Sequence, residues 1–161
     1  METSFKKIPS PVGTIYIVAD SSSLRVITFE KNWPTELQKW KNIEEGNNPI
    51  LQQTSCQLDE YFTGKRTTFE IPLTFTGTPF QNDTWKALLT IPYGQTRSYS
   101  EQAQIIGNPR AVRAVGRTNG LNPIAIIVPC HRVIGKSGKL TGYAGGLDIK
   151  RFLLDLEKNK P

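Results

Sequence analysis

The residue best suited to chemistry in this sequence is Cys130, which stands in the run Pro129-Cys130-His131-Arg132 beside the only histidine of the chain. A thiolate is a strong nucleophile, and a neighbouring imidazole is the usual base that generates it near neutral pH. Adjacent side chains of an extended segment point to opposite faces, so contact between Cys130 and His131 requires a turn or a bridging water. The alternative is an inert buried cysteine beside a chance histidine.

A glutamate near the end of the chain could complete a catalytic triad. Lys150 and Glu157 stand seven residues apart on the apolar stripe of a helix predicted over about residues 148–158. A carboxylate that faces inward needs a partner, because burying it unpaired is costly. Either His131 or Lys150 could be that partner, and cysteine, histidine and glutamate would then act as nucleophile, base and orienting group. Exposure of both charges at the helix edge is the alternative.

A basic helix face is the second feature that points to a ligand. An asparagine and a first-turn proline predict a helix over residues 108–120, on which Arg110, Arg113 and Arg117 follow the spacing i, i+3, i+7 around the small Ala114. Taken alone, this face could simply be solvated. A capping-box pattern predicts a short helix just before it, and two short helices joined by a turn are typical of a DNA-binding helix-turn-helix.

The remaining elements must position these side chains. The apolar run at residues 124–128 predicts a buried strand that leads into Cys130. Earlier in the chain, β-rich runs, helical periodicity and turn residues predict a pattern of strands followed by helix. The predicted segments are strands at 12–19, 24–29 and 68–75, with helices at 34–40, 51–64 and 80–91.

The charge of the chain changes at a predicted linker over residues 76–79. Residues 1–76 hold 8 Lys and Arg against 9 Asp and Glu, whereas residues 77–161 hold 12 against 5, a net charge of −1 against +7. A basic half-chain of this kind is a candidate for contact with nucleic acid, because basic groups release counterions from phosphates. The sequence therefore predicts two domains, residues 1–76 and 77–161.

The composition excludes several classes of protein. Within 161 residues, no apolar run approaches the roughly 20 residues of a membrane span, and the first residues lack the apolar core of a signal peptide. The two cysteines, Cys56 and Cys130, are too few for a disulfide framework, and with one histidine they cannot form a conventional structural zinc site. We expect a cytoplasmic protein without membrane contact, without metal, and with an incidental Cys56.

Three segments together resemble a known family. Pro129-Cys130-His131-Arg132-Val133-Ile134-Gly135, Thr141-Gly142-Tyr143-Ala144-Gly145-Gly146, and Leu153-Leu154 with Glu157 resemble the methylated-DNA–protein-cysteine (O6-alkylguanine-DNA) alkyltransferases. The resemblance runs from about residue 78 to residue 158. It implies an α+β protein, with an amino-terminal ribonuclease H-like α/β domain followed by a winged-helix or helix-turn-helix-like DNA-binding and catalytic domain.

The resemblance also implies roles for individual residues. Cys130 takes the alkyl group, His131 is the base acting through water, Glu157 orients it, and we expect the pair to lower the pKa of the thiol. Further catalytic residues are Asn122, a hinge that braces the segment before the cysteine, Tyr99, whose hydroxyl meets guanine N3, and Lys150, which lies near the cysteine. Arg113 fills the place of the flipped base. The remaining substrate- and DNA-binding set is Arg110, Arg117, Ala114, Tyr143, Ala144, Val133 and Arg132.

The implied function is direct DNA repair on double-stranded DNA that contains O6-alkylguanine, by a monomer that needs no cofactor and is consumed in one event. Two other functions fit the same residues: a helix-turn-helix regulator or lesion-recognising relative, and a cysteine hydrolase. Departures from the family pattern are Phe152, Arg117 and Asn119, together with the absence of the amino-terminal zinc ligands that some members carry.

Overall fold

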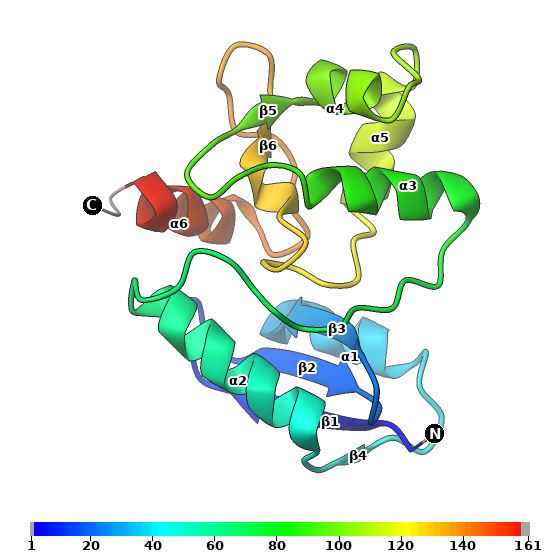
Figure 1. The fold of residues 1–161 in the computed structure, drawn as a ribbon, viewed down its shortest axis with the longest axis vertical. Helices are drawn as coiled ribbons and strands as arrows, with labels where there is room; N and C mark the ends of the chain where they lie inside the picture. The colour runs from blue at the N-terminus through cyan, green and yellow to red at the C-terminus, as the bar shows by residue number, and fades with distance from the viewer. Residues whose placement is uncertain (1, 159–161) are drawn as a thin grey trace. The chain divides into compact units, whose positions relative to one another are not determined.

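The computed structural model describes residues 2–158. It separates into two compact units, residues 1–75 and residues 76–161, each of which combines helices with strands (Figure 1). The mixed α+β class predicted from the sequence is confirmed. Among the described residues, no helix is both long enough and apolar enough to cross a membrane.

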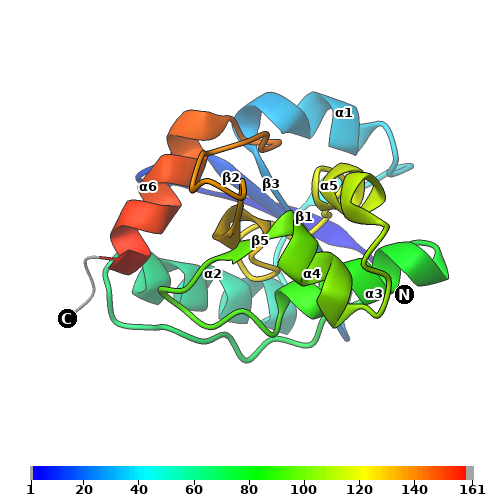
Figure 2. The same cartoon turned by 90° about the horizontal axis from the view of Figure 1, so that it is seen from above.

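The first unit is a four-stranded sheet with a helix on each face. The strands follow the order β3-β2-β1-β4, antiparallel except for the β1–β4 pair. Figure 2 shows the sheet between α1 and α2. The elements are β1 (Ser4–Ile8), β2 (Ile15–Ala19), β3 (Leu24–Phe29), η1 (Glu30–Asn32), α1 (Trp33–Leu37), β4 (Glu44–Glu45) and α2 (Pro49–Phe62).

Alternation along β2 explains the two layers of this core. Val18 faces α1, where Trp33 stacks on Tyr16 with ring centroids 4.7 Å apart. Neighbouring β2 residues project to the opposite side, and Ile15 and Ile17 are fully buried. The α2 helix packs along that sheet.

The strand predicted over residues 68–75 does not form. Its only pairing is an isolated bridge between Leu73 and Leu24. Pro72 has no N–H to donate, and the backbone N–H of Glu70 donates to the side chain of Gln57 at 2.9 Å. The segment is therefore tied down by α2 and by Leu24 rather than by a strand ladder.

The second unit is a helical layer around a short parallel pair of strands. Its elements are α3 (Pro79–Leu88), β5 (Arg97–Ser98), α4 (Tyr99–Ile105), α5 (Val112–Asn119), η2 (Cys130–Arg132), β6 (Val133–Ile134) and α6 (Leu147–Lys158). α3, α4 and α5 contact one another, and α6 contacts η2. The last helix agrees with its predicted range to within one residue.

The first helix of the predicted helix-turn-helix, α4, has clear start and stop signals. The predicted capping box at α4 is present, since Glu101 N donates to Ser98 Oγ and Ser98 N donates to the Glu101 carboxylate. The helix ends in a Schellman-type turn: Gly107 has φ +78° and Asn108 N donates to Ala103 O.

The second helix begins later than predicted. Residues 108–111 form a turn in which Ala111 N donates to Asn108 O, and α5 starts at Val112 with no side-chain cap. The backbone N–H of Asn108 belongs to the turn that ends α4, and its side chain does not cap α5. Arg110 therefore lies in the turn, and only Arg113 and Arg117 share the helix, one turn apart.

Candidate active site

Pairing of β5 with β6 brings the two predicted reactive segments together. Arg97 lies opposite Val133, and Ser98 lies opposite Ile134, in a parallel register. Tyr99 follows β5 directly and opens α4, whereas the 3-10 turn η2, which carries Cys130, directly precedes β6. Two segments more than 30 residues apart in the sequence thus meet at one short pair of strands.

The segment before the cysteine is a series of tight turns, not the predicted strand. Ile127 N donates to Ala125 O at 2.8 Å, and Ile126 between them has φ +72°, in the left-handed region that a β-branched residue rarely adopts. An apolar run predicts burial, and residues 124–128 are all buried, but it does not distinguish a strand from turns whose backbone groups find other partners.

The Asn122 side chain supplies partners at both ends of this segment. Its side-chain oxygen accepts from Ile124 N at 3.0 Å, and its amide nitrogen donates to Val128 O at 2.7 Å and to Cys130 Sγ at 3.2 Å. One side chain therefore spans the turns and reaches the sulfur. This geometry matches the bracing role that the family resemblance implies.

Glu157 is the centre of a buried ionic network. Its carboxylate accepts from His131 Nε2 at 2.7 Å and from Arg132 Nε and Nη2 at 2.7 and 3.1 Å. The remaining Arg132 nitrogen, Nη1, donates to Ile91 O at 2.7 Å. His131 is fully buried, and Glu157 is 3% exposed. Of the two partners considered from the sequence, histidine is present and Lys150 is not.

The network sets the charge states around the sulfur. Burial alone would raise the pKa of Glu157, but the hydrogen bonds and charges of His131 and Arg132 hold it at about 2. Burial lowers the pKa of His131 despite its bond to Glu157, so the imidazole is neutral at pH 7. Because Nε2 faces an ionised carboxylate, that nitrogen carries the proton. Within residues 2–158, the buried Nδ1 has no hydrogen-bond partner.

The thiol itself differs from the sequence expectation. Burial raises the pKa of Cys130, although the Asn122 amide and the Lys150 charge oppose it. His131 and Glu157 do not lower the pKa in the resting protein, because a neutral imidazole adds no positive charge. The resting sulfur is therefore a thiol, and its proton must be removed in the course of any reaction.

Lys150 ties the cysteine segment to a loop rather than to a carboxylate. Its fully buried ammonium group donates to Val133 O at 2.7 Å and to Thr141 O at 2.9 Å. Burial lowers the pKa of Lys150. The two carbonyls flank the loop over residues 134–140, so this side chain closes the base of the loop.

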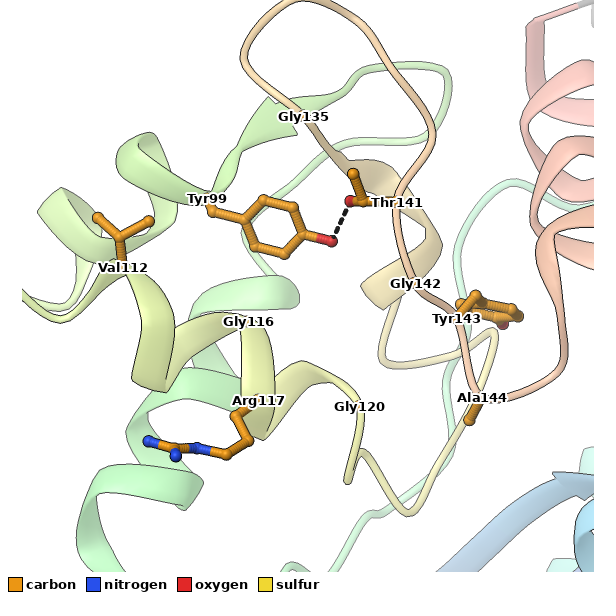
Figure 3. Close-up of a pocket in the computed structure, with 10 residues that line it drawn as sticks. All are labelled: Tyr99, Val112, Gly116, Arg117, Gly120, Gly135, Thr141, Gly142, Tyr143 and Ala144. Carbon is orange, nitrogen blue, oxygen red and sulfur yellow. Dashed lines mark hydrogen bonds between the residues drawn. The ribbon is translucent and has the colours of Figure 1, made fainter.

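A pocket of about 520 Å³ lies beside this loop (Figure 3). One wall comes from α5 through Gly116 and Arg117, and the other comes from the segment that follows the loop, through Tyr143 and Ala144. Tyr99 projects between them, and its hydroxyl lies 2.7 Å from Thr141 Oγ1. The pocket thus gathers four of the predicted substrate or catalytic residues, Tyr99, Arg117, Tyr143 and Ala144.

The remaining predicted DNA-binding residues fall into two groups. Arg110 and Arg113 are exposed, and Ala114 is half-buried on α5. Arg132 and Val133 are buried, and the Arg132 guanidinium is fully engaged with Glu157 and Ile91 O. Sequence reasoning missed this clamp, although an arginine next to the histidine and an inward glutamate were both visible signals.

The sequence also gave no indication of what Asn119 does. Its amide forms a reciprocal pair with Gln102, with distances of 2.7 and 2.9 Å, and both side chains are buried. The pair joins α4 to the end of α5, three residues before Asn122. Asn119 therefore lies at a buried polar position between the two helices, where the Gln102 amide supplies the matching donor and acceptor.

Comparison with protein families gives two matches that together span most of the chain. Residues 4–75 match the ribonuclease-like domain of 6-O-methylguanine DNA methyltransferase, and residues 79–159 match the DNA-binding domain of the same family.

Individual relatives are similar to this chain over almost its whole length. A methylated-DNA–protein-cysteine methyltransferase from Methanosarcina mazei is 51% identical over 152 residues, covering 94% of this chain and 95% of the relative. The crystal structure of the Mycobacterium tuberculosis O6-methylguanine methyltransferase is 48% identical, with a TM-score of 0.90, and covers 99% of this chain and 94% of that one. The M. tuberculosis OGT in complex with DNA, also 48% identical, has a TM-score of 0.88 over 98% of this chain and 94% of that one.

Proposed function

The chain belongs to the 6-O-methylguanine DNA methyltransferase family, and we propose that it repairs DNA by moving the alkyl group of O6-alkylguanine onto the sulfur of its own Cys130. The observation that carries this proposal is the setting of the thiol. Cys130 accepts a hydrogen bond from Asn122, and its neighbour His131 is bonded to the ionised Glu157. The partner is double-stranded DNA that contains the lesion, and the reaction requires no cofactor.

The chemical step is a displacement at the alkyl carbon. The sulfur lone pair forms the new S–C bond while the C–O6 bond breaks, and its electron pair leaves with the guanine. The thiol proton is lost and guanine gains one, so atoms and charge balance. The thioether has no leaving group comparable to guanine, so each protein molecule reacts once.

The proton leaves the thiol through His131. With Nε2–H held by Glu157, the Nδ1 lone pair is free to accept a proton through one water molecule. Glu157 then stabilises the imidazolium that forms, as the carboxylate of a serine protease triad does. Because burial raises the pKa of Cys130, this arrangement limits thiolate formation to the time when base and substrate are in place.

Access to the lesion requires that the base leave the duplex. Extruding a nucleotide costs a few kcal/mol, and less when the base is poorly paired. The α5 helix lines the pocket through Arg117, and Arg113, one turn before it, is exposed. We assign α5 to the groove of the DNA and Arg113 to the space that the flipped base vacates.

Arg132 and Lys150 act on the site through other residues. Arg132 holds the Glu157 carboxylate in place and ionised, so we propose a positioning role for it instead of the DNA contact that the resemblance implied. Lys150 positions the loop through Val133 O and Thr141 O. We also propose that the two domains span residues 1–76 and 77–161 and that the protein acts as a monomer.

Counting transfers per protein molecule tests the proposed function. With excess duplex that contains radiolabelled O6-methylguanine, each wild-type molecule should accept at most one methyl group, whereas Cys130→Ala should accept none and still bind DNA. Repeated turnover would instead indicate a hydrolase. Binding without transfer by the wild type would indicate a lesion-recognising protein.

A further inference from the structure

A hydrogen bond between two hydroxyl groups joins two residues that line the pocket. Tyr99 Oη and Thr141 Oγ1 lie 2.7 Å apart, although the residues are 42 positions apart in the sequence (Figure 3). Tyr99 is the first residue of α4, and Thr141 lies in the loop that follows β6. Both side chains line the pocket.

Each partner is fixed by backbone restraints on its own side. Thr141 is held through its carbonyl, which accepts from the buried Lys150 ammonium at 2.9 Å. Tyr99 is held by the capping box of Ser98 and Glu101 and by the pairing of Ser98 with Ile134. Because both backbones are already restrained, the contact requires little additional ordering of the backbone.

The direction of the bond decides what the phenol can do. A tyrosine hydroxyl has one proton, so a Tyr99 that donates to Thr141 has none for a ligand. A threonine hydroxyl can donate instead, and the tyrosine proton is then available to an acceptor in the pocket. The heavy-atom geometry allows both directions.

We propose that Thr141 is a positioning residue for the alkyl transfer: its hydroxyl donates to Tyr99 Oη, which leaves the Tyr99 proton for the contact with guanine N3 that the family resemblance implies. The proposal rests on the proposed function, because N3 is a base atom of that substrate. Negative charge builds on the guanine as the C–O6 bond breaks, so a donor to N3 is worth more in the transition state than before it. Donation from Thr141 polarises the phenol and strengthens that bond.

The opposite direction makes the opposite prediction. If Tyr99 donates to Thr141, this hydrogen bond must break before Tyr99 can donate to the substrate. Removing the threonine hydroxyl would then speed the reaction. The sign of one rate change therefore separates the two arrangements.

The test is a set of single-turnover transfer rates on duplex DNA that contains O6-methylguanine. Thr141→Val keeps the size of the side chain and should slow transfer about fivefold to tenfold, the effect of losing one hydrogen bond. Thr141→Ser keeps the hydroxyl and should react at close to the wild-type rate. Thr90→Val removes a hydroxyl that bonds only Ala87 O on α3 and should match wild type.

Two crossed comparisons exclude a general loosening of the loop. In a Tyr99→Phe background, Thr141→Val should change the rate by less than about twofold, because the relay is already broken. A duplex with O6-methyl-3-deazaguanine, in which N3 is replaced by C–H, should likewise make wild type and Thr141→Val equal. A fivefold loss that persisted in either case would show a structural effect and overturn the proposal.

Failure of the inference is distinguishable from failure of the proposed function. If wild type transfers methyl groups and Thr141→Val is equally fast or faster, Thr141 has no positioning role and the proposed function stands. If wild type transfers none from the O6-methylguanine duplex, the proposed function is wrong and this inference with it.

Discussion

The two units of the chain differ in what they bury. Among the described residues of the first unit, Asp20 is the only buried charged side chain, and its carboxylate accepts from the neighbouring Ser22 and Ser23. Among the described residues of the second unit, His131, Arg132, Lys150 and Glu157 are buried, together with the Cys130 thiol.

This difference shows where each unit obtains its stability and where its chemistry lies. Apolar contacts such as those around Trp33 hold the first unit, and its arginine–glutamate pair of Arg66 and Glu60 lies at the surface. Burying charges is costly unless they are paired. In the second unit, burial keeps His131 neutral, and its pairing with Glu157 holds the segment that carries Cys130. Removing one member of an ion pair should therefore lower the free energy of unfolding strongly in the second unit and only slightly in the first.

The largest effect should follow from breaking the buried ion pair. Arg132→Met leaves the buried Glu157 carboxylate without its guanidinium partner, and it should lower the free energy of unfolding by about 3–5 kcal/mol. The matched change in the first unit, Arg66→Met, should cost less than about 1 kcal/mol, because Glu60 is 45% exposed. Urea unfolding followed by hydrogen exchange of peptides from each unit measures both. Equal costs would contradict the contrast.

Acid should destabilise the second unit selectively. The pKa of Glu157 is about 2 in the folded state, against an ordinary 4.5, so its stabilisation is complete above pH 4.5 and is lost as pH falls toward 2. Burial also lowers the pKa of His131. The stabilisation that depends on a neutral His131 is therefore lost as the pH falls below 6.5. The glutamate alone should account for about 3 kcal/mol.

The measurement is the urea midpoint of wild type from pH 7 to pH 3, compared with Glu157→Gln. The glutamine variant should be less stable at pH 7 and show a flatter profile. If the urea midpoint of wild type, followed in peptides of the second unit, did not fall between pH 7 and pH 3, the assigned charge states would be wrong.

A smaller effect should follow from breaking the buried amide pair. Asn119→Ala removes the donor to Gln102 Oε1, while Gln102 Nε2 keeps its bond to Thr84 O, and should cost about 1–3 kcal/mol. Replacing both Asn119 and Gln102 by leucine should recover part of the loss. In the first unit, Gln57→Ala removes an amide that bonds the backbone of Glu70 and should cost about 1 kcal/mol. Thermal unfolding of the three variants and wild type tests this, and a double variant less stable than Asn119→Ala would contradict it.

The smallest effect on stability should come from the exposed arginines. Arg113→Ala and Arg110→Ala should each change the free energy of unfolding by less than about 0.5 kcal/mol. Arg110→Ala should reduce the salt slope of DNA binding by about one unit. Arg113→Ala should slow reaction of the duplex lesion far more than reaction of free O6-methylguanine, which needs no flipping. Equal slowing of both substrates would remove the assigned role of Arg113.

Features that depend on neighbouring residues in the sequence could be predicted. The Ser98–Glu101 capping box and α6 depend on spacing over one or two turns, and both are present. The Cys130, His131 and Glu157 set could be named because the apolar stripe and the single histidine left few alternatives.

Features decided by tertiary contacts could not be predicted. The turns before Cys130 depend on which backbone groups Asn122 reaches, and an apolar run looks the same in a strand. The start of α5 depends on how α4 ends. The sequence left His131 and Lys150 open as the partner of Glu157 and gave no sign of Arg132. That His131 and Arg132 are the partners depends on where α6 packs, which local spacing does not determine.

The two cysteines offer the most direct test of alkyl transfer, because each unit contains one. Cys56 is exposed and Cys130 is buried. Peptide-resolved mass spectrometry after reaction with duplex DNA that contains O6-methylguanine should find one added methylene unit on Cys130 and none on Cys56. Native protein treated with iodoacetamide should show the reverse preference. A methyl group on Cys56, or on neither cysteine, would contradict the account.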